Sequence, residues 1–311
     1  MIAPLCQHEE RTKRGKDRRG NQRYRCKSCG RMFTDNAPRP LGDMRINLNQ
    51  AGLIVSLLME GMSIRGIERI TGVHQDTIGA LILQVGENCQ RFMDSLEGLD
   101  VSDIQIDEIW AFVGAKEKNK TNMEQGDTWT YIAIERNTKM VVAFHVGLRN
   151  QHDCDQFLGK VNQATAGSKC QVSTDGLNVY RHGVPFAMGS RVDFGQLVKT
   201  YASSQTETRY SPATIIKSEK ISRFGNPDQD KICTSHIERF NLTMRMTNRR
   251  MTRLTNAFSK SQDHHRCMQA IVFCYYNWCR KHETIQATPA MAQGIASEKW
   301  TVKRMIKEVA S

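Results

Sequence analysis

A switch from helical to strand periodicity constrains the fold of this chain more than any other feature. Residues 103–113 read D-I-Q-I-D-E-I-W-A-F-V, in which polar and apolar residues alternate as in a half-buried strand. Two more strand patterns follow over residues 129–136 and 139–146, then a helical pattern over 152–164 and a fourth strand over 169–176. The order β-β-β-α-β predicts an α/β domain built on a mixed sheet with one crossover.

Two acidic residues occupy informative positions in these strands. Asp107 lies inside the first strand, and Asp175 ends the fourth strand, directly before Gly176. Acids at strand ends in α/β sheets tend to meet at the crevice where ligands bind. By the two-residue period of a strand, Glu108 is expected to point to the opposite sheet face, whereas Asp103 shares the face of Asp107 near the strand start. Spacing alone therefore makes Asp107 and Asp175 candidates for a shared site.

A third acid lies on a long helical pattern over residues 234–260. At helical spacing the apolar stripe consists of Ile237, Phe240, Met244, Met251, Leu254 and Phe258. The neighbouring face carries Glu238, Asn241, Arg245 and Arg249. On an isolated helix this face would be a solvated flank with a salt bridge. Alternatively, carboxylates from a strand interior, a strand end and a helix can converge to hold divalent cations, because Mg²⁺ prefers carboxylate oxygens.

The distribution of charge favours a nucleic-acid ligand. The 311 residues carry a net charge of +12. Residues 1–35 hold ten Lys and Arg against four acids, and residues 234–285 hold nine against three, so the rest of the chain is neutral. No apolar run approaches the roughly 20 residues that span a bilayer, and no signal sequence is evident at the start. We therefore expect a cytoplasmic protein that has no membrane partner.

The first 37 residues contain a zinc-type cysteine pair. Cys26 and Cys29 are followed by Gly30, as in a zinc knuckle, in which two thiolates lie on a tight turn. Cys6 and His8 are the upstream candidates for the other half of a Zn²⁺ site, and His8 is the weakest ligand because only one residue separates the two. The alternative is that both thiols of the pair are unligated. The other cysteines lie in apolar segments, which is typical of core residues in a reducing compartment.

A helix-turn-helix outline follows over residues 45–95. Helical patterns cover residues 47–60, 63–71 and 75–92, with Ser63 as an N-cap and a glycine-containing turn before the third helix. A short helix, a turn and a longer helix are typical of DNA-binding modules. The alternative is a small helical bundle that only packs against the rest of the chain.

These motifs together resemble the insertion-sequence-one family of DDE transposases, which have an RNase H-like catalytic core. The resemblance is carried by D-E-I-W at Asp107, S-T-D-G ending at Gly176, and H-I-E-R-F-N-L-T-M-R around Glu238, with T-N-A-F-S-K-S downstream. The N-terminal C-x-x-C-G-R-x-F and the late Y-N-W-C-R-K-H and T-P-A-M-A match as well. The first zinc pair departs from the family pattern, because it reads C-x-H in place of C-x-x-C.

The resemblance implies a metal-dependent DNA-joining enzyme. Asp107, Asp175 and Glu238 would be the catalytic triad that binds Mg²⁺ or Mn²⁺, supported by His236, Asn241, Arg245 and Arg249. The alternative is that His236 has no role in the site and only caps its helix. The expected DNA contacts are Arg18, Arg19, Gln75, Thr77, Lys116 and Lys118. The expected partners are double-stranded transposon ends, target DNA and a second copy of the chain.

The expected domain organisation has four parts. They are a zinc-ribbon-like module over 1–37, the helix-turn-helix over 45–95, the RNase H-like catalytic domain over 100–285 and a C-terminal tail over 286–311. Residues 185–233 give no clear pattern, apart from a strand candidate over 214–221. Two other functions remain open from the residues: a DNA-binding regulator with a non-catalytic core, and a nuclease of the same fold that cuts without joining.

Overall fold

The structure is a computed structural model that describes residues 10–17, 22–34, 40–201, 215–252 and 256–311. Contacts divide the chain into a small unit, Met1–Pro40, and a large unit, Leu41–Ala310. Cys6, His8, Arg18 and Arg19 lie outside the described residues, so their predicted roles stay predictions.

The small unit contains an antiparallel sheet of three strands, β1 (Arg11–Lys16), β2 (Gln22–Cys26) and β3 (Met32–Thr34). Its core consists of Tyr24, Cys26 and Phe33, and the rings of Tyr24 and Phe33 stack at 5.7 Å. After β2 the chain makes a tight turn, in which the Gly30 N–H donates to the Cys26 carbonyl at 3.0 Å and Gly30 has a φ of +74°. The predicted glycine-assisted turn is confirmed, and the zinc itself stays a prediction.

The large unit begins with three helices whose bounds agree with the sequence prediction. They are α1 (Leu48–Met59), α2 (Ile64–Thr71) and α3 (Gln75–Asp94). The Ser63 hydroxyl accepts the Gly66 N–H at 3.1 Å, as expected of an N-cap, and α2 ends at Gly72 with a φ of +69°. The helices share one hydrophobic core with the sheet described next.

A six-stranded mixed sheet forms the centre of the large unit. Its strands are β4 (Asp103–Val113), β5 (Gly126–Glu135), β6 (Val141–Gly147), β7 (Cys170–Asp175), β8 (Val192–Tyr201) and β9 (Ile215–Phe224). The spatial order is β6-β5-β4-β7-β8-β9, in which β4, β5 and β6 form an antiparallel meander and β7 and β8 run parallel to β4. The predicted mixed sheet is confirmed, and its order is compatible with an RNase H-like core.

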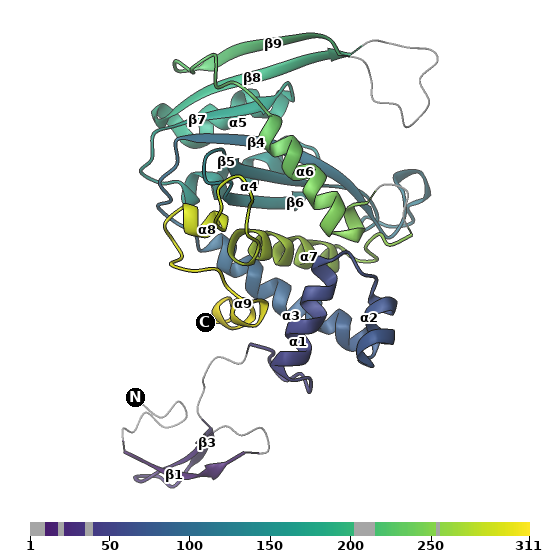
Figure 1. Cartoon of the computed structure of the whole chain (residues 1–311), viewed down its shortest axis with the longest axis vertical. Coiled ribbons are helices and arrows are strands. Elements are labelled where there is room, and N and C mark those ends of the chain that lie inside the picture. The colour runs from purple at the N-terminus through teal and green to yellow at the C-terminus, as the bar shows by residue number, and fades with distance from the viewer. Residues whose placement is uncertain (1–9, 18–21, 35–39, 202–214, 253–255) are drawn as a thin grey trace. The chain divides into compact units, whose positions relative to one another are not determined.

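Helices cover both faces of this sheet (Figure 1). The crossover helices α4 (Gln151–Ala164) and α5 (Asn178–Met188) lie behind the sheet in this view, and α6 (Ser235–Thr247) lies in front of it. Below α6, α7 (Gln262–Cys274) packs against α3 so closely that a Cβ on Gly86 would lie 2.3 Å from that of Cys267. The chain closes with the short helices α8 (Pro289–Ala292) and α9 (Val302–Glu308). None of the described helices is long and apolar enough to cross a membrane.

The helix predicted over residues 234–260 is shorter than expected. It ends at Thr247, where Asn248 leaves the helical conformation with φ −109° and ψ 101°. The buried Asn248 side chain donates to Gln269 Oε1 at 3.1 Å and accepts the Arg250 N–H at 3.2 Å, which stabilises the turn. Arg249 therefore does not continue the row of Glu238, Asn241 and Arg245; it lies in a separate 3₁₀ turn, Arg249–Met251.

Candidate functional site

Three carboxylates meet where β7 ends. Oxygens of Asp107, Glu108 and Asp175 all lie within 4.8 Å of one another. The register pairs β4 with β7 only as far as Ile106 opposite Thr174, so the next residues of β4 flank the last residue of β7. The parallel strands thus bring Asp107 and Asp175 together, as their positions in the sequence suggest. As the two-residue period predicts, the two acids point to opposite faces of the sheet: Glu108 contacts Tyr180 of α5, and Asp107 contacts α6. Their oxygens still lie close together, because β7 ends beside them.

Helix α6 contacts this cluster through Asn241. The Asn241 amide donates from Nδ2 to Asp107 Oδ2 at 2.8 Å. Its other polar atom, Oδ1, is buried and has no hydrogen-bond partner within the described part of the chain. A buried amide oxygen without a donor is costly, so it marks a place where a further group is needed.

The electrostatics of the cluster favour a bound cation. Burial raises the pKa of Asp107 to about 8, and the negative charges of Glu108, Asp175 and Glu238 add to the effect. Burial and Asp175 likewise raise the pKa of Glu108, although Arg149 opposes this. Neighbouring acids repel one another when ionised, and a divalent cation removes that repulsion.

Glu108 is engaged by other side chains. Arg149 forms an ion pair with its Oε1, and the wholly buried Tyr180 hydroxyl donates to its Oε2 at 3.0 Å. The Arg149 guanidinium in turn lies 4.7 Å from the centre of the Trp129 ring. Both carboxylate oxygens of Glu108 therefore have protein partners.

Glu238 is not part of the three-acid group. Its Oε1 forms an ion pair with Lys199 of β8 and accepts the Thr234 hydroxyl at 2.7 Å. Its side chain is 48% exposed, and its charge contributes to the raised pKa of Asp107. The assignment of Glu238 to a triad with Asp107 and Asp175 stays a prediction.

The start of α6 is attached to the strand that carries Asp107. Gln105, a wholly buried residue of β4, accepts the N–H groups of His236 at 2.9 Å and Ile237 at 3.1 Å through its Oε1. The first N–H groups of a helix have no partner within the helix, so Gln105 caps α6. The His236 ring contacts Lys139 Nζ at 3.2 Å, and burial together with that cation lowers the pKa of His236.

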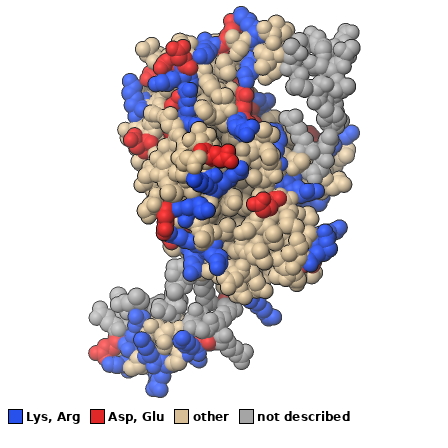
Figure 2. All heavy atoms as spheres, viewed as in Figure 1, with Lys and Arg blue, Asp and Glu red and all other residues tan. Residues whose placement is uncertain are grey.

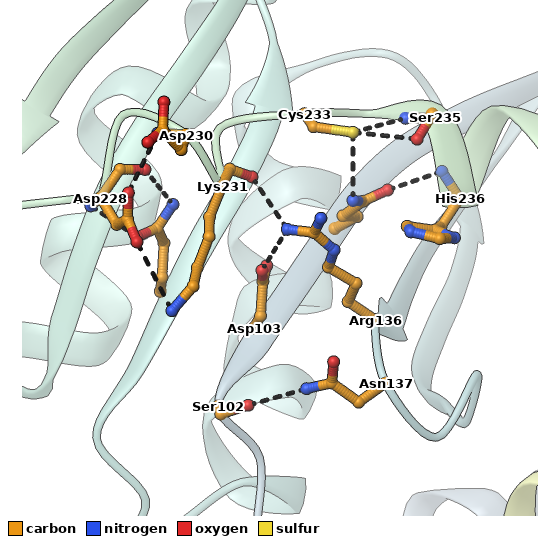
Figure 3. Close-up of polar contacts among 12 residues, drawn as sticks. Ser102, Asp103, Arg136, Asn137, Asp228, Asp230, Lys231, Cys233, Ser235 and His236 are labelled. Atoms are coloured by element: carbon orange, nitrogen blue, oxygen red, sulfur yellow. Dashed lines mark hydrogen bonds and ion pairs between the residues drawn. The ribbon is translucent and has the colours of Figure 1, made fainter.

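Further polar contacts fix the loop before α6 (Figure 3). Arg136 binds Asp103 Oδ2 at 3.0 Å and reaches the Lys231 carbonyl at 3.5 Å. Gln171 of β7 exchanges two hydrogen bonds with the backbone of Asp228, at 3.1 and 2.8 Å. The loop is thus attached to the two parallel strands of the site, which sets the position of α6. Sequence reasoning missed Gln105 and Gln171, because a single glutamine in a strand pattern carries no signal.

Replacing Gln105 by alanine is expected to lower the free energy of unfolding by about 2 kcal/mol, because two N–H groups of the helix lose their acceptor and a wholly buried side chain is shortened. Urea denaturation measures the change. The matched control is Gln163→Ala, which removes an exposed glutamine of α4 and should change stability by less than about 0.5 kcal/mol. Equal effects of the two substitutions would show that Gln105 does not anchor α6.

The described residues that are predicted to contact DNA are exposed or half-buried. Gln75 is exposed and Thr77 half-buried at the start of α3, and Lys116 and Lys118 are exposed between β4 and β5. Lys and Arg also outnumber acids over the described residues of the small unit (Figure 2). This distribution agrees with the charge pattern of the sequence, and the individual contacts stay predictions.

Comparison with known proteins gives little further guidance. No family model matches the chain, and no curated protein matches it. Among solved structures it is similar to a piggyBac transposase in a synaptic complex with hairpin DNA, at 10% identity and a TM-score of 0.39, over 88% of this chain and 72% of the other. A likeness this distant carries no weight, so function has to come from the site.

Proposed function

We propose that this protein is a DDE transposase of the insertion-sequence-one type, which cleaves DNA at transposon ends and joins the freed 3′-hydroxyl to a target phosphodiester. The observation that carries the proposal is the meeting of Asp107, inside β4, with Asp175, at the end of the parallel strand β7, within a group of three carboxylates. Strand order compatible with an RNase H-like core supports it.

The side chains of the cluster suit a divalent metal ion. Hard oxygen donors attract Mg²⁺ and Mn²⁺, and the buried Asn241 Oδ1 offers one more oxygen beside Asp107. Asp107 and Asp175 would hold the ion, with Glu238 of α6 as the third predicted ligand. When bound, such ions activate an attacking water or hydroxyl and stabilise the leaving oxygen of a phosphoryl transfer.

Other residues of the chain then have defined tasks. Asn241 orients the Asp107 carboxylate, and Gln105 holds the helix that carries Asn241. Lys199 pairs with Glu238 and supplies positive charge beside the cluster, where a DNA phosphate would arrive. The zinc-type module and the helices α1–α3 would bind terminal inverted repeats, and two copies of the chain would hold the two ends.

A strand-transfer assay tests the proposal. The full chain is incubated with end DNA, target plasmid and Mg²⁺, or with EDTA in place of the metal. We expect joined product with Mg²⁺ and none with EDTA. Cleaved but unjoined DNA would identify a nuclease of the same core. DNA binding without either product would instead favour a regulator whose sheet is structural.

A further inference from the structure

A second site is formed by a cavity of about 1150 Å³ between the starts of α2 and α3 and the segment that follows α6. Four cationic residues line it: Arg65, Arg249, Arg250 and Lys260. The lining contains one acid, Asp76, whose side chain is 88% exposed and pairs with His74. The cavity wall is therefore strongly positive.

Among the described residues, none of the four cations has an ion-pair partner. Within the described part of the chain, no Asp or Glu oxygen lies within 4.0 Å of Arg65, Arg249, Arg250 or Lys260. Burial lowers the pKa of Arg250 to about 10, so its guanidinium stays charged at neutral pH. A partly buried cation without an anion is costly, which points to an anionic ligand that is absent from the isolated chain.

The rest of the lining selects among anions. Gln75 and Gly79, at the N-terminal end of the 20-residue helix α3, face the cavity, and the positive end of the helix dipole adds to the field there. Met62, Leu83 and Phe258 supply apolar surface. Cations, a helix N-terminus and apolar contacts together suit the backbone of a nucleic acid better than a small free anion.

The cavity is also connected to the strand of the acid cluster. The Phe258 ring lies 4.6 Å from that of Phe112 on β4, and Lys260 Nζ lies 3.2 Å from the centre of the Phe258 ring. Gly114, the residue that follows β4, donates its N–H to the Ser259 carbonyl at 2.8 Å. A phosphate bound here would contact a segment that is hydrogen-bonded to the end of the strand carrying Asp107.

We propose that this cavity binds a phosphodiester group of duplex DNA through Arg250 and Lys260, beside the start of α3. The inference rests on the proposed function only in that it takes DNA as the ligand. It adds a binding site for the DNA backbone which is separate from the acid cluster and which joins the helix-turn-helix outline to β4.

The test measures binding of a labelled 30-base-pair duplex by fluorescence anisotropy between 50 and 300 mM NaCl, without metal. Arg250→Gln should weaken binding about tenfold at 100 mM salt and lower the slope of log K against log salt by about 1, as expected for one lost phosphate contact. The matched control is Arg304→Gln, because Arg304 is already paired with Glu298 and Glu308. The control should leave the slope unchanged.

A second measurement locates the phosphate. Duplexes with one neutral methylphosphonate at successive positions should include one that weakens wild-type binding about tenfold and does not further weaken Arg250→Gln. If Arg250→Gln does not fold, Lys260→Gln takes its place in both measurements, because the Lys260 side chain is exposed. Wild-type binding with an unchanged slope in the variants overturns the inference and leaves the proposed function intact, whereas no wild-type binding at any salt overturns both.

Discussion

Replacing Asp107 by asparagine is expected to abolish cleavage and joining, on the order of a 10³-fold loss or more, while raising the stability of the metal-free protein. Activity is lost because the neutral amide cannot hold a cation beside Asp175. Stability rises because burial, together with the negative charges of Glu108, Asp175 and Glu238, raises the pKa of the wild-type carboxyl group to about 8. The amide removes that repulsion and still fits the space of the acid.

The same pKa gives the gain in stability a defined pH dependence. In the unfolded chain Asp107 ionises near pH 4, whereas in the folded chain it holds its proton up to about pH 8. A folded pKa above the unfolded value contributes stability below pH 4, and this stability is lost as pH rises through the window from about 4 to about 8. In EDTA, wild-type Tm should therefore fall by about 5 °C more than that of Asp107→Asn between pH 5 and pH 8.

Thermal melts at the two pH values, with EDTA or Mg²⁺, measure both effects. Mg²⁺ should raise the wild-type Tm at pH 8 and have little effect on Asp107→Asn, because a ligand stabilises only the form that binds it. Asp263→Asn is the matched control, since its carboxylate is 74% exposed on α7 and its Tm should follow the wild type. Parallel curves for wild type and Asp107→Asn would mean that Asp107 is ionised in the folded chain and that the cluster does not require a cation.

The sequence predicted the meeting of Asp107 and Asp175 because strand alternation is a strong signal and an acid at the end of a strand in an α/β sheet tends to lie at the site. The same alternation correctly predicted that Glu108 points to the opposite sheet face, where it contacts Tyr180. It could not show that the Glu108 carboxylate still lies close to Asp107, since the period of a strand does not reveal where its neighbour ends. Nor could it show that Asn248 interrupts the long amphipathic pattern, because the interruption depends on a tertiary contact with Gln269.

The secondary structure of residues 185–233 could not be predicted for related reasons. Helix α5 contains Pro185, which removes a helical donor and disguises the pattern. Strand β8 contains Gly195, where a Cβ would lie 2.4 Å from the Ile232 side chain. The glycine therefore allows Ile232 to pack against the strand, and this tertiary contact cannot be predicted from the neighbouring sequence. The buried contacts of Gln105 and Gln171 are tertiary in the same sense.

The identity of the third acidic ligand is decided by comparing Glu238→Ala with Glu108→Ala. Glu238 is half-exposed and its partner Lys199 can return to solvent, so Glu238→Ala should change the free energy of unfolding by less than about 1 kcal/mol. We expect it to lose joining by on the order of 10³-fold, because α6 then offers no carboxylate beside Asp107. Glu219→Ala is the matched control, since Glu219 is an acid of β9 that is paired with Lys217 and should be dispensable.

Glu108→Ala should show the opposite pattern. It leaves the buried Tyr180 hydroxyl without an acceptor and opens a cavity behind β4, so we expect a loss of about 3 kcal/mol in the free energy of unfolding. Joining measured at 15 °C, where the variant is still folded, should stay within about tenfold of wild type, because both Glu108 oxygens already have protein partners. If a folded Glu108→Ala protein loses joining while Glu238→Ala retains it, the metal is held by the three acids that lie together, and α6 contributes Asn241 alone.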